Sequence, residues 1–140
     1  MVDEYKRKVE RFCAHVYESS FDDEIFDEVL VLGTEEFMYP ALELAGYLQD
    51  RGVGKKIMSH STTRSPITAY NKDTYPLCSR YKLISLYDDE RVTYLYNLRK
   101  YDKVIIVTDS ELKSDKGLQS LTAALKSVGN NDIVVYQWSV

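Results

Sequence analysis

A run of hydroxyl-bearing residues followed by an arginine, Ser61-Thr62-Thr63-Arg64-Ser65-Pro66, is the segment of this sequence best suited to bind an anion. Arginine binds phosphate or carboxylate through two N–H groups at once, and serine and threonine hydroxyls add further donors. The proline restricts the backbone directly after these donors. The same composition also suits a turn whose hydroxyls bond the loop backbone while Arg64 pairs with a surface carboxylate, so both interpretations stay open.

A second candidate is Gly33-Thr34-Glu35-Glu36-Phe37-Met38-Tyr39-Pro40, which lies between a short apolar run and a helical pattern. Glycine permits a tight turn, and the unbonded N–H groups of a first helical turn favour an anion or a hydrogen-bond acceptor. Glu35 and Glu36 would repel a phosphate and suit a metal ion, a sugar hydroxyl or a cationic group better. The alternative is that Thr34 caps the helix and the glutamates complement its dipole.

A third candidate, Thr108-Asp109-Ser110-Glu111, follows the strongest predicted strand. An aspartate at the carboxyl end of a strand suits a ribose hydroxyl or a hydrated metal. The sequence establishes no cofactor and no metal-ligand set, and Mg²⁺ is the one candidate. Asp109 would be equally natural as a helix cap. His60 could act as an acid or base near neutral pH, but a single histidine without a definable partner is more often structural.

Length, charge and cysteine usage limit the class of protein. With 140 residues and 44% hydrophobic content, we expect one domain over residues 1–140. The net charge of -4, from 22 acidic and 18 basic residues, leaves no broad positive potential that would attract the phosphates of nucleic acid. No apolar run suits a membrane span or a secretion signal, so we expect a cytoplasmic protein with no membrane partner. Cys13 and Cys78 form no CxxC pair, which argues against a zinc or thioredoxin-like site.

The hydrophobic periodicity predicts an α/β fold. Two strand-helix-strand units flank a hairpin insertion at 80–98, and an amphipathic helix within residues 1–20 covers the body. Right-handed crossovers would produce a Rossmann-like three-layer sandwich with a mainly parallel sheet, and both helix-opening loops would lie at its carboxyl edge. The predicted elements are a helix at 3–19, a strand at 28–32, a helix from Pro40 to Gly52, a strand at 55–60, a loop at 61–79, hairpin strands at 81–87 and 91–98, a strand at 104–107, a helix ending at Gly129 and a strand at 132–138.

The predicted hairpin carries polar and aromatic residues that could form a lid over the site: Arg80, Tyr81, Tyr94, Tyr96 and Asn97. The alternative is that alternate members of the tyrosine set pack across the two strands.

The first two motifs, in this order and about twenty residues apart, resemble the TRSP domain, a family named for its Thr-Arg-Ser-Pro motif. The elements Tyr96-Asn97 and Tyr101-Asp102 are similar to further parts of the pattern, so the resemblance covers roughly residues 28–110. The resemblance implies that the chain corresponds to the C-terminal part of certain bacterial proteins. The N-terminal part of those proteins is usually an orotate-phosphoribosyltransferase-like domain. Such proteins are encoded in stress and tellurium-resistance clusters, which are thought to make a nucleotide-like metabolite.

The chain departs from that arrangement, because it begins one helix before the first motif and contains no separate transferase domain. The Thr-Gly-rich loop with paired acids that phosphoribosyltransferases use is also missing, and Thr108-Asp109-Ser110 occupies the comparable place. We therefore expect binding rather than independent phosphoribosyl transfer, in either a separately encoded partner of such an enzyme or an excised domain.

Two functions follow from the motifs and the resemblance. The first is a site for a phosphorylated, nucleotide- or phosphoribosyl-like metabolite, with Arg64 holding the anion. The second is a non-catalytic module that docks on a phosphoribosyltransferase domain or subunit through the N-terminal helix and exposed tyrosines, and a homodimer is a further prediction. The predicted binding residues are Gly33, Thr34, Glu35, Thr62, Thr63, Arg64, Ser65, Tyr96 and Asn97, and the candidate catalytic residues are Glu36, His60 and Asp109.

Overall fold

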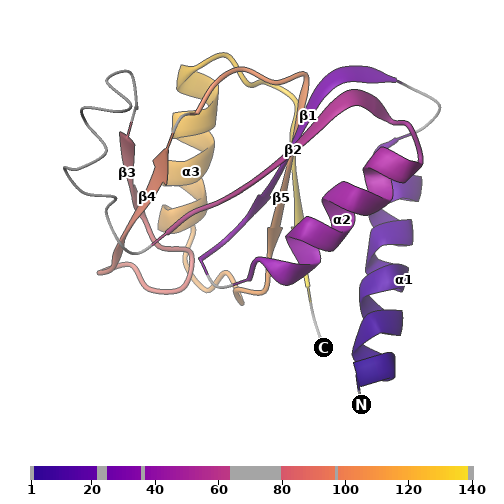
Figure 1. The fold of residues 1–140 in the computed structure, drawn as a ribbon. Coiled ribbons are helices and arrows are strands. Elements are labelled where there is room, and N and C mark those ends of the chain that lie inside the picture. Colours follow the sequence, from indigo (N-terminus) through magenta and orange to yellow (C-terminus); the bar gives the residue numbers. More distant parts are fainter. Residues whose placement is uncertain (1, 22–24, 36, 64–79, 97, 139–140) are drawn as a thin grey trace, which may run out of the picture.

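The computed structural model describes residues 2–21, 25–35, 37–63, 80–96 and 98–138 (Figure 1). The helices are α1 (Val2–Ser20), α2 (Tyr39–Asp50) and α3 (Lys116–Ser127). The strands are β1 (Phe26–Gly33), β2 (Gly54–Ser61), β3 (Arg80–Ile84), β4 (Val92–Tyr96), β5 (Lys103–Thr108) and β6 (Ile133–Gln137).

The main sheet is parallel and has the strand order β2-β1-β5-β6, whereas β3 and β4 form a separate antiparallel hairpin. This confirms the predicted α/β fold. The central strands β1 and β5 are unbroken apolar runs because both of their faces are covered. Residues 29–32 and 104–107 are all completely buried.

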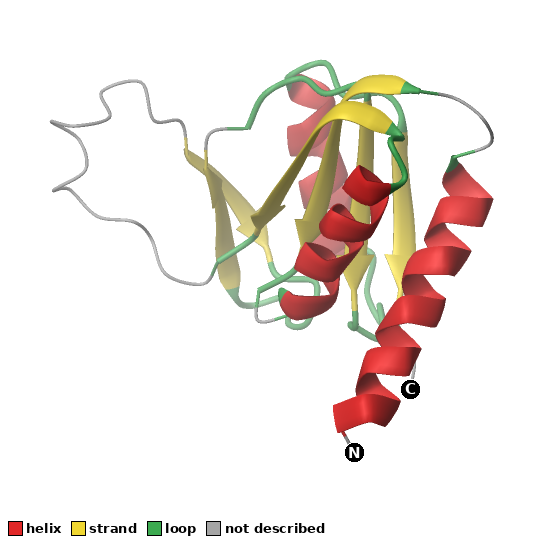
Figure 2. Ribbon diagram, turned by 45° about the vertical axis from the view of Figure 1, so that its right-hand side comes forward, coloured by secondary structure: helices red, strands yellow, loops and turns green. Residues whose placement is uncertain are grey.

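Side-chain alternation along the central strands divides the interior into two cores. Val29 and Val31 pack with α1 and α2 on one face of the sheet. Leu30 and Leu32 point to the other face, where they pack with α3 and the hairpin. Figure 2 shows α1 and α2 in front of the sheet and α3 behind it. Among the described residues, no helix is long and apolar enough to cross a membrane.

The helix ends follow the predicted glycine stops. After α2, Gly52 takes the left-handed conformation at φ 69°, and after α3, Gly129 does so at φ 97°. Pro40 lies in the first turn of α2, where a missing N–H costs nothing.

The hairpin strands are shorter than their pattern predicts, because residues 85–91 leave the ladder and fold over the edge of the main sheet. The N–H of Ser85 donates to the carbonyl of Arg91 at 2.9 Å and closes this 85–91 turn. Ser110 holds the turn to the sheet by donating its hydroxyl to the carbonyl of Leu86 at 2.6 Å. Tertiary contacts thus replace strand pairing at these positions.

The hairpin also meets the end of β2. Thr63 and Tyr94 exchange two backbone hydrogen bonds, of 2.9 Å and 2.7 Å. The chain therefore passes from the parallel sheet into contact with β4 just before Arg64.

Candidate functional site

The carboxyl ends of β1 and β5 form the switch point of the sheet, because the chain leaves β1 toward β2 on one side and β5 toward β6 on the other. Thr34 and Thr108 lie at these two strand ends, and both are completely buried. The hydroxyl of Thr34 donates to that of Thr108 at 2.9 Å. Two polar side chains are thus paired where open α/β sheets usually bind ligands.

Tyr87, from the 85–91 turn, covers this switch point. Its hydroxyl lies 2.7 Å from Oγ1 of Thr34 and donates to the carboxylate of Asp109. Burial and the hydrogen bond to Asp109 raise the pKa of Tyr87, so the phenol keeps its proton at neutral pH. The polar side chains at the switch point therefore contact one another, and Tyr87 and Asp109 also line a groove of about 730 Å³ beside it.

Glu35 turns inward beside Tyr87, with its side chain 5% exposed. Its carboxylate accepts a hydrogen bond of 2.6 Å from Ser85 and pairs with Arg91 at 3.0 Å. Glu35 also has φ at 52°, a conformation that non-glycine residues seldom adopt. The carboxylate fastens the 85–91 turn to the loop after β1.

The two predicted loops lie side by side after β1 and β2. The N–H of Thr62 donates to the carbonyl of Gly33 at 3.1 Å, and the N–H of Glu35 donates to the Thr62 hydroxyl at 3.0 Å. Gly33 is required here, because a Cβ at this position would lie 2.7 Å from the carbonyl oxygen of Phe37. Thr62 is 2% exposed, so its hydroxyl serves the loop contact.

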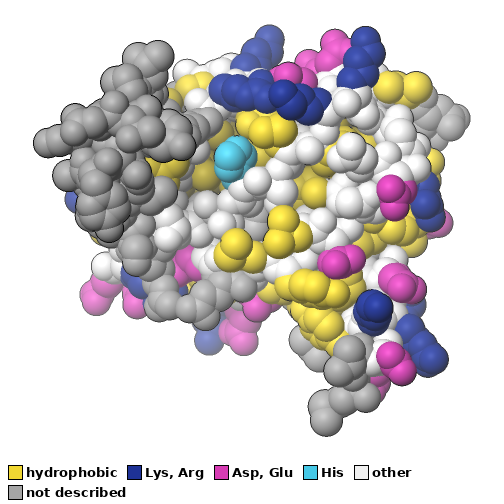
Figure 3. All heavy atoms as spheres, in the orientation of Figure 1, with side chains coloured by type: hydrophobic (Ala, Val, Ile, Leu, Met, Phe, Trp, Pro, Cys, Tyr) yellow, Lys and Arg dark blue, Asp and Glu magenta, His cyan; other side chains and the backbone are white. Residues whose placement is uncertain are grey.

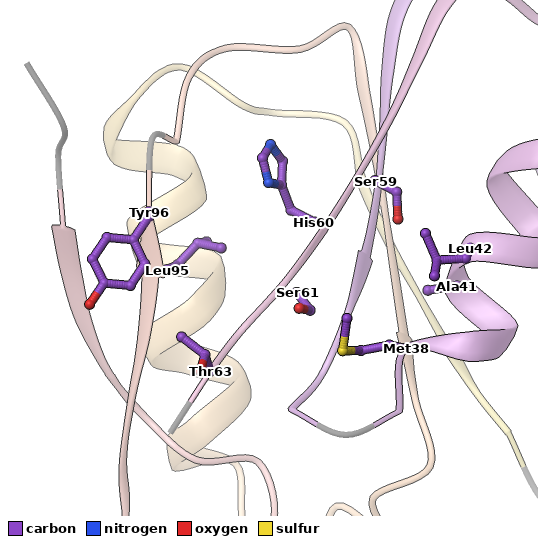
Figure 4. A pocket seen from close by; sticks show the side chains of 9 residues that line it. All are labelled: Met38, Ala41, Leu42, Ser59, His60, Ser61, Thr63, Leu95 and Tyr96. Atoms are coloured by element: carbon purple, nitrogen blue, oxygen red, sulfur yellow. The ribbon is translucent and has the colours of Figure 1, made fainter. Parts of the chain in front are cut away.

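A groove of about 460 Å³ opens on the outer side of β2, and we call it the β2 groove. Its walls are the first turn of α2, the second half of β2 and the hairpin strand β4, and its volume suits a small ligand. Figure 4 shows Ser59 and His60 on opposite sides of β2. The lining residues are Met38, Ala41, Leu42, Ser59, His60, Ser61, Thr63, Leu95 and Tyr96.

The electrostatics of the β2 groove come from a helix end and an imidazole. Met38 precedes α2 without any side-chain hydrogen bond to cap the helix, so the positive end of the dipole lies at the groove wall. Burial and the nearby Arg99 lower the pKa of His60. At neutral pH its imidazole is uncharged and offers one donor and one acceptor.

Over residues 2–125, the chain matches the protein family described as "TRSP domain C terminus to PRTase_2". This chain belongs to the TRSP domain family. TRSP domains lie next to phosphoribosyltransferase domains, and the match confirms the resemblance carried by the two motifs. No curated protein matches the sequence. Strand β6 lies beyond the matched residues of the TRSP domain.

The structure of this TRSP domain separates the predicted site residues into two groups. His60, Thr63 and Tyr96 line the β2 groove. A second group belongs to the strand ends and their hydrogen bonds: Gly33, Thr34, Glu35, Thr62 and Asp109. The remaining predicted residues lie outside the described part of the TRSP domain: Glu36, Arg64, Ser65 and Asn97.

Sequence reasoning missed the groups that close the switch point. Ser85, Tyr87 and Arg91 belong to a turn about 50 residues away from the loop they contact, and no local pattern marks them. The paired hydroxyls of Thr34 and Thr108 could have been anticipated, because each follows an apolar strand of a parallel sheet. Within the described residues, no cluster of His, Cys, Asp and Glu suits a metal ion.

Proposed function

We propose that this TRSP domain binds a phosphorylated, nucleotide- or phosphoribosyl-like metabolite in the β2 groove, as part of a phosphoribosyltransferase-linked module. One observation carries the proposal. Ser61 and Thr63 line the same groove as the uncapped first turn of α2, directly before Arg64 in the chain. Hydroxyl donors, a helix N-terminus and an arginine that is the next residue in the sequence form a set that suits phosphate oxygens.

The rest of the groove suits the remainder of such a metabolite. Tyr96 offers a ring for stacking, and its own ring stacks on Tyr94 with centroids 6.4 Å apart. Leu95 lies beside Tyr96, and Met38 and Leu42 provide an apolar surface on the opposite wall of the groove (Figure 4). A diphosphate ligand would carry Mg²⁺ with it, because Mg²⁺ is commonly held by substrate phosphates.

The arrangement supports binding more strongly than catalysis. Of the candidate acid–base groups, His60 lines the groove, whereas Asp109 accepts a hydrogen bond from Tyr87 at the switch point. The third candidate, Glu36, lies outside the described residues. We therefore assign His60 to hydrogen bonding with the ligand, and any phosphoribosyl transfer to the partner enzyme.

Calorimetric titration with 5-phosphoribosyl 1-diphosphate and with AMP tests the proposal. We expect saturable binding by the native domain and at least roughly tenfold weaker binding by Arg64→Ala and Thr63→Val, since each removes a donor. Thr122→Val on α3 is the matched control and should bind like the native domain. Absence of binding by the native domain, or equal affinities in all four proteins, would refute the proposal.

A second candidate function, docking on a phosphoribosyltransferase domain, is favoured by an exposed apolar surface. Four residues of α1 and of the start of α2 are 42% to 54% exposed: Tyr5, Met38, Tyr39 and Leu42. Figure 3 shows hydrophobic side chains gathered on this face of the molecule. Tyrosine and methionine are enriched in protein interfaces, and the family lies next to phosphoribosyltransferase domains.

Mixing the chain with a separately expressed domain of the PRTase_2 family tests docking. We expect a complex in size-exclusion chromatography that is lost in the double variant Tyr39→Ser with Leu42→Ser. Ile25→Ser is the control, because Ile25 is 74% exposed and not part of this surface. A complex that survives the double variant, or no complex at all, would exclude this interface. Met38 and Leu42 also line the β2 groove, whereas Tyr39 does not, so the single variant Tyr39→Ser tests docking separately from metabolite binding.

A further inference from the structure

The two edges of the parallel sheet differ in what adjoins them. At one edge, the chain beyond β2 pairs with β4 through Thr63 and Tyr94. At the other edge, β6 pairs with β5, and no second strand of the described chain pairs with its outer side. Open strand edges are ready templates for another extended chain.

Hydrogen bonds at the two ends of β6 define which of its backbone groups face outward. The N–H of Val104 donates to the carbonyl of Asp132 at 2.9 Å, and the N–H of Trp138 donates to the carbonyl of Thr108 at 2.7 Å. Because both backbone groups of a residue in a parallel strand point to the same side, alternate residues of β6 face β5. The intervening residues direct their N–H and C=O groups to the open side: Ile133, Val135 and Gln137.

A groove of about 490 Å³ lies between α1 and the C-terminal end of β6, and we call it the β6 groove. It is basic and aromatic in a protein whose net charge is -4. No carboxylate occurs among the described residues that line it. The lining residues are Lys8, Arg11, Phe12, His15, Tyr136, Gln137 and Trp138.

The opposite face of the same edge is apolar. Ile133 and Val135 are partly buried and pack toward the core beneath α3, whereas Tyr136 packs toward α1. A strand added beside β6 would therefore present alternate side chains to two different surroundings. One set would meet the cations of α1, and the other would meet the β-branched side chains of β6.

We propose that β6 accepts an extended segment of a partner protein in which acidic and apolar residues alternate. The outward-facing N–H and C=O groups of Ile133, Val135 and Gln137 form the backbone hydrogen bonds to this segment. Lys8 and Arg11 select the acidic side chains by charge complementarity. The proposed metabolite in the β2 groove plays no part in this interaction.

Trp138 provides a direct readout, because it lines the β6 groove and is the single tryptophan of the chain. The probe is an acetylated, amidated peptide of four Val-Glu repeats, and its charge-reversed counterpart has four Val-Lys repeats. We expect a saturable change in tryptophan fluorescence with the Val-Glu peptide and at least roughly tenfold weaker binding of the Val-Lys peptide.

Charge reversal in the protein supplies the matched test. The double variant Lys8→Glu with Arg11→Glu should lose the preference for the Val-Glu peptide, whereas Lys126→Glu on the exposed side of α3 should retain it. Equal responses to both peptides in the native protein, or no response to either, would overturn the proposal.

Hydrogen exchange separates strand addition from other occupants of the groove. The Val-Glu peptide should slow amide exchange at Ile133, Val135 and Gln137 and leave alternate residues unchanged. A fluorescence change without this protection would indicate an anion site instead and overturn strand addition. Protection that grows with protein concentration in the absence of peptide would assign the edge to a second copy of the chain, which also overturns the proposal.

Discussion

Adjacent threonines of the Thr-Arg-Ser-Pro region have different surroundings. Thr62 is buried and accepts a hydrogen bond from Glu35, whereas Thr63 lines the β2 groove and pairs with Tyr94. Alternation in an extended chain explains the difference, because successive side chains point to opposite sides. A substitution of Thr62 therefore tests the structure of the loop, whereas a substitution of Thr63 tests contact with the ligand.

Gly33→Ala should lower the free energy of unfolding by about 1–3 kcal/mol, because the added Cβ would lie 2.7 Å from the carbonyl oxygen of Phe37 and 3.1 Å from Cβ of Ala41. Urea denaturation measures the change. Gly46→Ala is the control, since nothing lies within 4 Å of its added Cβ and alanine favours helix by about 0.5–1 kcal/mol. If Gly33→Ala were stabilised as Gly46→Ala is expected to be, the close approach at Gly33 would be contradicted.

Cys13 should make the fold sensitive to alkaline pH. Burial, followed by the nearby Glu43, raises the pKa of the Cys13 thiol to about 11 from 9.0. Because the native thiol holds its proton more tightly than the unfolded one, its contribution to stability is fully present below about pH 9 and is lost as pH rises through about 11. Urea denaturation between these values should show a steeper loss of stability in the native chain than in Cys13→Ala. Parallel pH profiles would exclude this role.

The 85–91 turn lies over the switch point and is joined to it by hydrogen bonds. Tyr87 and Ser85 reach across from the hairpin to Thr34 and Glu35, and Ser110 holds the backbone of the turn. Gly117 lets α3 approach the same turn, because a Cβ there would lie 2.4 Å from the carbonyl oxygen of Ser85. The hairpin is thus joined to the sheet edge by polar contacts on one side and by helix packing on the other.

Arg91→Ala should lower the free energy of unfolding by about 2 kcal/mol, because it removes the cation paired with the buried carboxylate of Glu35. Adding Glu35→Gln should recover part of the loss, since no charge then remains buried. Lys113→Ala is the control, because the pair between Lys113 and Glu111 is 85% and 76% exposed and contributes little. If chemical denaturation showed the same loss of unfolding free energy for Arg91→Ala and Lys113→Ala, a structural role for the buried pair would be contradicted.

The whole molecule has two cores that share the strands of one sheet. Val31 and Ile105 belong to the core under α1 and α2, whereas Leu30 and Ile106 belong to the core under α3 and the hairpin. Because neighbouring residues of the same strands build both cores, neither core can lose its packing without affecting the other. We therefore expect one cooperative unit.

Leu44→Ala and Leu121→Ala probe the two cores separately, and each should cost about 2–5 kcal/mol because both side chains are completely buried. Tryptophan fluorescence reports on Trp138 beside α1, and far-UV circular dichroism reports on all helices. The two signals should give the same denaturation midpoint in the native protein and in each variant. Separate midpoints in either variant would show that the cores unfold independently.

The order and type of the elements could be predicted from the sequence because hydrophobic periods and glycine stops act locally. The runs at 29–32 and 104–107 indicated central strands, and the structure confirms both. The lengths of the hairpin strands could not be predicted, because residues 85–91 obtain their partners from distant segments. The same limitation applies to Tyr87, whose place over the switch point depends on how the hairpin packs.

By itself, the sequence determined an α/β domain of the TRSP family with two motif loops at neighbouring strand ends. Those features depend on local periodicity and on motif order along the chain. Only the tertiary structure decided that Thr34, Glu35 and Thr62 bond within the fold while His60 and Thr63 line a groove. It also decided that β6 has an open edge beside Lys8 and Arg11. The physical reason is that the environment of a polar side chain depends on packing between segments that the chain order leaves far apart.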